Sequence, residues 1–81
     1  MKTFLAVAMS GDPRTVQIIS PEGKTFSCYV DIYQTPLEAA MMWLTPIQHG
    51  FHGERLAYEK NTCTVWELDF DDTPPVTPPQ V

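Results

Sequence analysis

The residues whose spacing could hold a metal ion are two histidines and a short acidic run. His49 and His52 lie three residues apart between glycines, but no cysteine or third histidine stands close to them. Asp69, Asp71 and Asp72 could bind a hard cation through oxygen, yet the run lacks the glycine and the later glutamate of a calcium loop. We therefore expect no metal or cofactor site, and interpret the two segments as a loop and a solvated acidic run.

The candidate nucleophiles in the sequence are two cysteines. Cys28 and Cys63 are too far apart for a Cys-x-x-Cys motif, and we expect two reduced thiols; a disulfide between them would need an oxidising compartment. Cys28 shares an apolar strand face with Phe26 and Val30, where thiols are usually inert. The sequence also lacks a phosphate-binding glycine loop and the common hydrolase and zinc-protease motifs. We predict that the protein is not an enzyme.

Alternating side chains predict three strands in the first third of the chain. They cover residues 4–9, 15–20 and 25–33, and turn-forming residues separate them. The opening segment also resembles a secretion signal, but its apolar run of six residues is short for one. We interpret it as the first strand.

A helix should begin at Thr35, because Thr35-Pro36-Leu37-Glu38 matches a capping box with proline at the first helical position. Thr45-Pro46 should end the helix or kink it. The residues at helical spacing that would cover a sheet are Leu37, Ala40, Met41 and Leu44.

Two further strands, residues 54–60 and 63–70, should form a hairpin around Lys60-Asn61-Thr62. The fold class is therefore α+β: a mainly antiparallel sheet in the order β-β-β-α-β-β with one helix packed on it. Residues 1–70 should form this single domain, and residues 71–81 an acidic, Pro-rich, disordered tail. Pro75-Val76-Thr77-Pro78 within it fits a Pro-x-x-P ligand.

The charge of the chain favours some partners over others. Ten acidic residues against five basic ones give a net charge of -5, which opposes phosphate backbones and favours a basic protein surface. We expect no direct nucleic-acid ligand. No stretch approaches membrane-spanning length, and two reduced thiols are in keeping with a cytoplasmic protein.

The helix should offer a docking surface. If one stripe covers the sheet, Ala39, Met42 and Trp43 project from the other side, and Glu38 is the one charge on the helix. Methionine and tryptophan are typical of interfaces and their hot spots. Alternatively, the last strands or the loop at residues 47–51 cover that side and make it core.

A second candidate surface is the polar face of the last strand. Glu67 and Asp69 alternate there with Trp66, Leu68 and Phe70, and could meet a basic partner. The alternative is a plain solvated face.

Residues 30–40, Val-Asp-Ile-Tyr-Gln-Thr-Pro-Leu-Glu-Ala-Ala, followed by Trp43, Pro46 and Gly50-Phe51, resemble the small RNA polymerase inhibitor of T-odd podophages. That family shows a strand ending in Ile-Tyr, a Thr-Leu-x-Glu-Ala helix start, a helix tryptophan and Pro-x-Gly-Phe before a strand. The family's inhibitor uses two arginines on that strand against the polymerase jaw. Arg55 matches the first, whereas Ala57 stands at the second. The pattern is also similar to small acidic anti-CRISPR proteins.

Both resemblances imply a compact protein that occupies a functional surface on a host nucleic-acid machine. We hypothesise a phage or mobile-element protein that inhibits or modulates a CRISPR effector or RNA polymerase by protein–protein docking. The alternative is a structural or homo-oligomer-forming domain, for example a homodimer that pairs through the helix surface. The candidate partner-binding residues are Met42, Trp43, Ala39, Arg55, Glu67 and Asp69.

Overall fold

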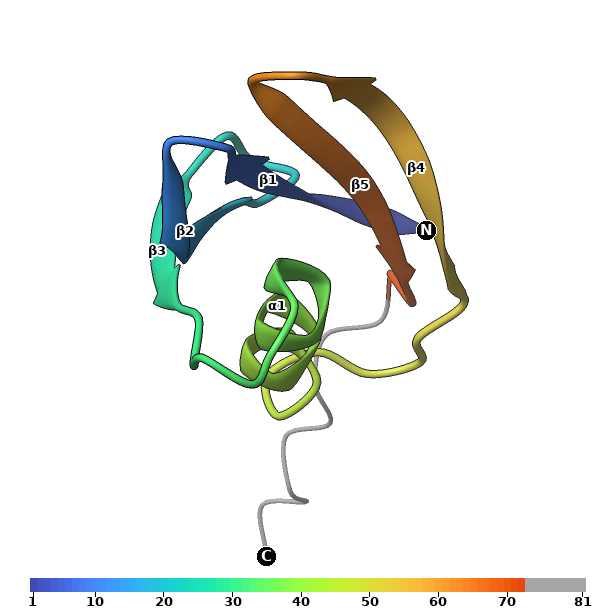
Figure 1. The fold of residues 1–81 in the computed structure, drawn as a ribbon. Coiled ribbons are helices and arrows are strands. Elements are labelled where there is room, and N and C mark those ends of the chain that lie inside the picture. Colours follow the sequence, from blue (N-terminus) through green and yellow to red (C-terminus); the bar gives the residue numbers. More distant parts are fainter. Residues whose placement is uncertain (73–81) are drawn as a thin grey trace, which may run out of the picture.

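The structure, a computed structural model, describes residues 1–72. Five strands and one helix follow one another along the chain (Figure 1). They are β1 (Lys2–Met9), β2 (Asp12–Ile19), β3 (Thr25–Tyr29), α1 (Pro36–Leu44), β4 (Gly53–Lys60) and β5 (Cys63–Phe70). The expected α+β class and element order are confirmed. Of the predicted tail at residues 71–81, Asp71 and Asp72 are described and bond to His52 and Met1, and residues 73–81 lie outside the described residues.

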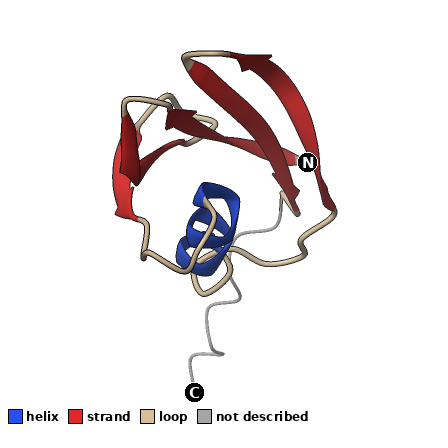
Figure 2. Ribbon diagram, in the orientation of Figure 1, coloured by secondary structure: helices blue, strands red, loops and turns tan. Residues whose placement is uncertain are grey.

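All five strands belong to one antiparallel sheet in the order β3-β2-β1-β5-β4. β1 lies at the centre because β5 pairs along its whole length, from Lys2 opposite Phe70 to Met9 opposite Cys63. A three-strand meander and the β4–β5 hairpin therefore meet at this central pair. Figure 2 shows the sheet curving around the helix, which lies on its concave side.

The start of α1 is fixed by the capping box that the sequence predicts. The Thr35 hydroxyl accepts a hydrogen bond from the Glu38 backbone N–H (3.1 Å), and the Glu38 carboxylate accepts one from the Thr35 N–H (2.9 Å). These bonds satisfy two N–H groups that have no partner within the helix. The helix ends at Leu44, just before Thr45-Pro46 as expected. Among residues 1–72, no helix is long and apolar enough to cross a membrane.

The core lies between α1 and the β1–β2–β3 half of the sheet, because the helix packs on these three strands. Phe4 of β1 meets the edge of Phe70 of β5, with ring centroids 5.7 Å apart. Each large side chain that is fully buried here contributes about 1.5–3 kcal/mol. The buried apolar residues are Phe4, Ala6, Val16, Ile18, Cys28, Val30, Ala39, Ala40, Leu44, Leu68 and Phe70.

The third strand is shorter than the sequence predicts. Alternation continues to Tyr33, but β3 ends at Tyr29, and Val30 makes one further bond to the Arg14 carbonyl (2.7 Å). The chain must leave the sheet at this point to reach the helix, and residues 31–34 form a turn in which the Gln34 N–H donates to the Asp31 carbonyl (3.0 Å). The turn carries its apolar residues out of the sheet and into solvent.

Candidate docking surface

The buried side of the helix includes the predicted stripe but extends further around the helix than spacing predicts. Ala40 and Leu44 are fully buried, and Leu37 and Met41 pack against the core. The prediction that Ala39 projects outward is wrong, because this residue is 3% exposed, and Trp43 is half-buried against the core. Met42 is exposed as expected, at 65%. The cause is the neighbouring strand: β3 lies beside the helix, so the side that carries Ala39 and Trp43 contacts it. The Cys28 thiol of β3 lies 3.5 Å from the Ala39 carbonyl oxygen.

Apolar side chains from β3, the following turn and α1, three segments linked by the Phe26–Trp43 and Gln34–Met42 contacts, are together called the β3–α1 patch. Trp43 is the half-buried residue of the patch, and the centroid of its ring lies 5.1 Å from the ring centroid of Phe26. Tyr33, in the turn, is 90% exposed, and Ile32 and Met42 are also exposed. The patch therefore consists of Phe26, Ile32, Tyr33, Met42 and Trp43.

Gln34 fastens the turn to the helix. Its side-chain amide donates to the Met42 sulfur (2.9 Å), and its side-chain carbonyl accepts from the Asp31 N–H (3.1 Å). The turn is held at both ends, since the Gln34 backbone also bonds to Asp31. The exposed Ile32 and Tyr33 side chains are therefore carried by a structured turn that contacts the helix beside Met42.

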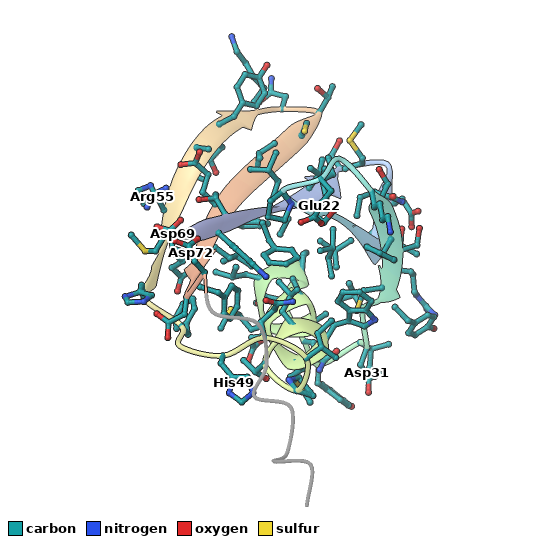
Figure 3. All side chains as sticks on the ribbon, turned by 180° about the vertical axis from the view of Figure 1, so that it is seen from behind. Glu22, Asp31, His49, Arg55, Asp69 and Asp72 are labelled. Carbon is teal, nitrogen blue, oxygen red and sulfur yellow. The ribbon has the colours of Figure 1, made fainter. Side chains whose placement is uncertain are left out.

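Most of the charges around the patch are acidic. Asp31 lies in the turn (Figure 3), and Glu38 precedes Met42 by about one helical turn on the same side of α1. Residues 26–43 contain these two acids and no lysine, arginine or histidine. Arg14 of β2 also lies at the end of β3, where its guanidinium donates to the Tyr29 hydroxyl (3.2 Å). With two acids and this cation beside it, the apolar surface favours a partner surface that is apolar and basic.

The expected acidic face of β5 is largely neutralised within the protein. Arg55 of β4 donates to Glu67 from Nε (3.0 Å) and pairs with Asp69 through Nη1, and Figure 3 shows Arg55 beside Asp69. The Thr3 hydroxyl donates to Asp69 as well (2.8 Å). Asp69 is 5% exposed. The Arg55 guanidinium and then the Thr3 hydroxyl hold the pKa of Asp69 below its usual value.

This arrangement corrects the interpretation of β5 as an open acidic face. The Asp69 carboxylate is engaged inside the protein, and the arginine that matches the podophage pattern is engaged with it. Glu67 keeps a partly exposed side chain. Among the candidate residues on β4 and β5, the Arg55 and Glu67 side chains stay 54% and 34% exposed, whereas the Asp69 side chain is 7% exposed, so Asp69 is the one withdrawn from solvent.

The two histidines make different contacts, and within residues 1–72 only the backbone carbonyl of His49 is bonded to Asp71. The His52 ring bonds to the Asp71 carboxylate, and Figure 3 shows His49 apart from Arg55 and Asp69. Asp72 pairs with the Met1 ammonium group (2.8 Å). Residues 1–72 contain no group of three or more histidine, cysteine or acidic side chains that could hold a metal ion.

Both cysteines are free thiols, in the reduced state that the sequence predicts. Cys28 is buried under the helix, and this burial raises the pKa of its thiol. Cys63 is partly exposed at the start of β5. The buried thiol packs as a small apolar side chain, in keeping with its place among the core residues.

Sequence reasoning found Met42 but missed Ile32 and Tyr33, because alternation continued through them and placed them in a strand. The signal that could have found them is Asp31, a turn former four residues before the helix cap. Comparison of the chain with family models, with curated proteins and with solved structures gave no match.

Proposed function

We propose that this chain is a non-enzymatic protein-binding domain that docks on a partner protein through the β3–α1 patch. The exposure of Met42 carries the proposal: this apolar side chain stands in water, and its sulfur accepts a hydrogen bond from Gln34 of the turn that holds the exposed Ile32 and Tyr33. Single exposed apolar residues are ordinary, but contiguous apolar patches often mark interaction sites. Tryptophan and tyrosine that are held in place lose little entropy on binding, and they dominate hot spots.

The partner surface should be basic. Asp31 and Glu38 border the patch, and the chain as a whole carries a charge of -5. Complementary charge accelerates encounter and selects the partner, whereas apolar contacts at the centre supply most of the affinity. The complex should therefore form more slowly as salt is added.

The partner class that we propose first is a nucleic-acid-processing complex in the cytoplasm of a bacterial host, a CRISPR effector or an RNA polymerase. The resemblance of residues 30–51 to phage-encoded inhibitors supports this choice. Complexes of this class also need basic surfaces for phosphate backbones. An acidic protein seated on such a surface would inhibit by occupying it.

The test compares two matched double variants of the full chain. Met42→Gln with Tyr33→Ser removes apolar surface from the patch, and Leu56→Gln with Tyr58→Ser removes similar surface from exposed positions on β4. Binding to immobilised RNA polymerase and to CRISPR effector is measured by biolayer interferometry. We expect the patch variant to bind at least about tenfold more weakly, as loss of a hot spot would cause, and the β4 variant to bind nearly as the wild type does.

Two results would count against the proposal at different levels. Absence of wild-type binding to both complexes would reject the proposed partner class. Wild-type binding that the patch variant retains in full would reject the patch as the docking surface. Circular dichroism of both variants checks that the fold is intact.

A further inference from the structure

A groove separate from the β3–α1 patch lies where the two hairpin turns meet the start of the helix. It has a volume of about 340 Å³. The Ser10 N–H donates to the Thr62 carbonyl (3.0 Å) and joins the β1–β2 turn to the β4–β5 turn. Figure 1 shows these two turns at the same end of the molecule.

The apolar part of the groove is rich in rings. Trp66 of β5 pairs with Ala6 and faces the helix side of the sheet, and it is only partly buried because α1 lies over β1, β2 and β3. Pro13 and Pro36 line the groove near it. A tryptophan beside proline rings is a surface on which other proline rings pack well, as in known Pro-rich recognition grooves.

The polar part of the groove is rich in hydrogen-bond donors. Its lining includes Ser10, Lys60, Asn61, Thr64 and Trp66, whose side chains can all donate, and the described residues that line it include no aspartate or glutamate. Within residues 1–72 none of these five side chains makes a hydrogen bond. A polyproline II segment offers the matching chemistry, because its carbonyl groups are unpaired and proline has no N–H to donate.

We propose that this groove binds a proline-rich segment in polyproline II form, and that the occupant is segment 74–79 of a second copy of the chain. That segment reads Pro-Pro-Val-Thr-Pro-Pro, so four of its residues lack an N–H and supply only acceptors. Asp71 and Asp72 precede it in the chain. Both acids are engaged within their own copy, Asp71 with His52 and Asp72 with the Met1 ammonium group, so the match rests on the acceptors of the segment and on Lys60 of the groove as a donor.

The place where the described chain ends argues for a second copy. From Trp66 to Phe70, β5 runs four residues away from the groove, about 13 Å at about 3.3 Å per residue. Asp72, which lies beyond the end of β5, forms an ion pair with the Met1 ammonium group. Pro74 and Pro75 follow Asp72 by two and three residues, about 9 Å of polyproline II chain at most. The chain between Asp72 and Pro75 is therefore too short to bring these two prolines to Trp66 of the same copy. A second copy can present the whole segment.

The test is the oligomeric state of the full chain, measured by sedimentation equilibrium at rising concentration into the millimolar range. We expect a reversible dimer. Replacing Pro75 and Pro78 together by alanine should weaken it at least about tenfold. Lys60→Glu in the groove should also weaken it, whereas its matched control Lys24→Glu, on the turn before β3, should not.

A second measurement uses a synthetic peptide of residues 71–81 and the wild-type chain. The peptide should dissociate the dimer and change the tryptophan fluorescence, and a version with alanine at 75 and 78 should do neither. A chain that stays monomeric, or a dimer that the double alanine variant leaves unchanged, overturns the proposal. The Met42→Gln/Tyr33→Ser variant should still dimerise, so failure of the groove and failure of the β3–α1 patch give different results.

Discussion

Gly50 is the position where the addition of a single methyl group should clearly lower the free energy of unfolding. Its φ angle is +69°, in the left-handed region, and a Cβ built on it would overlap the carboxylate of Asp71. Asp71 cannot easily move away, because its N–H donates to the His49 and Gly50 carbonyls (3.1 Å each) and its side chain bonds to His52. Gly50→Ala must therefore strain the backbone and displace the Asp71 side chain.

The two costs can be separated in magnitude. Holding a residue with a Cβ in the left-handed region costs about 1–2 kcal/mol. Losing an exposed His52–Asp71 interaction adds about 0.5–1 kcal/mol. We expect Gly50→Ala to lower the free energy of unfolding by about 1.5–3 kcal/mol in total. Gly23 has a φ of +90° but open space around it, so Gly23→Ala should carry only the backbone cost.

The assay is urea unfolding followed by tryptophan fluorescence, with Asp71→Ala used to complete a double-mutant cycle. In the Asp71→Ala background, Gly50→Ala should cost about 1–2 kcal/mol, because the overlap is gone and the backbone cost remains. The difference between the two backgrounds measures the contact between residues 50 and 71.

Two outcomes would refute this reasoning. The first is an equal loss of stability for Gly50→Ala and Gly23→Ala, since only the former has a neighbour to displace. The second is a cost of Gly50→Ala that does not change when Asp71 is shortened. Either result would mean that the side chain of Asp71 does not lie over Gly50 in solution.

Three further predictions concern the cap, the ion pair and the thiols. Thr35→Ala should lower the free energy of unfolding by about 1 kcal/mol and Thr35→Ser by much less; equal losses would exclude the cap as the cause. The lowered pKa of Asp69 means that the ion pair stabilises the fold above the unfolded pKa and loses this effect as pH falls through the folded pKa. Arg55→Met should therefore lose less stability than the wild type between about pH 5 and pH 2, seen in urea midpoints; parallel losses would contradict this. Iodoacetamide should label Cys63 in the folded protein and Cys28 only on unfolding, because burial hides that thiol and raises its pKa; equal labelling rates would refute it.

Local chemistry in the sequence was sufficient to predict most elements. The capping box around Thr35, the stop at Pro46 and the turn at residues 60–62 each act within a few residues, so their outcome does not depend on the rest of the fold. Alternation likewise assigned Trp66, Leu68 and Phe70 to the helix side of the sheet.

The candidate surfaces were less predictable, because they depend on neighbours that are distant in sequence. Helical spacing showed that Met42 differs from the core stripe, but not that β3 would cover Ala39. The strand pattern showed acids on β5, but not that Arg55 would lie across from Glu67 and close to Asp69. The alternation up to Tyr33 could not reveal where the chain leaves the sheet.

The sequence by itself determined the class, the order of the elements and the residues that share a face, because periodicity and capping are properties of a single segment. Only the tertiary structure decided where the helix lies across the sheet. In that position the helix covers three strands and leaves Trp66 only partly buried. The same position buries Ala39 and exposes Met42. The physical reason is that the residues on one face of a helix or strand do not specify which element packs against that face. The packing of the whole chain selects this neighbour.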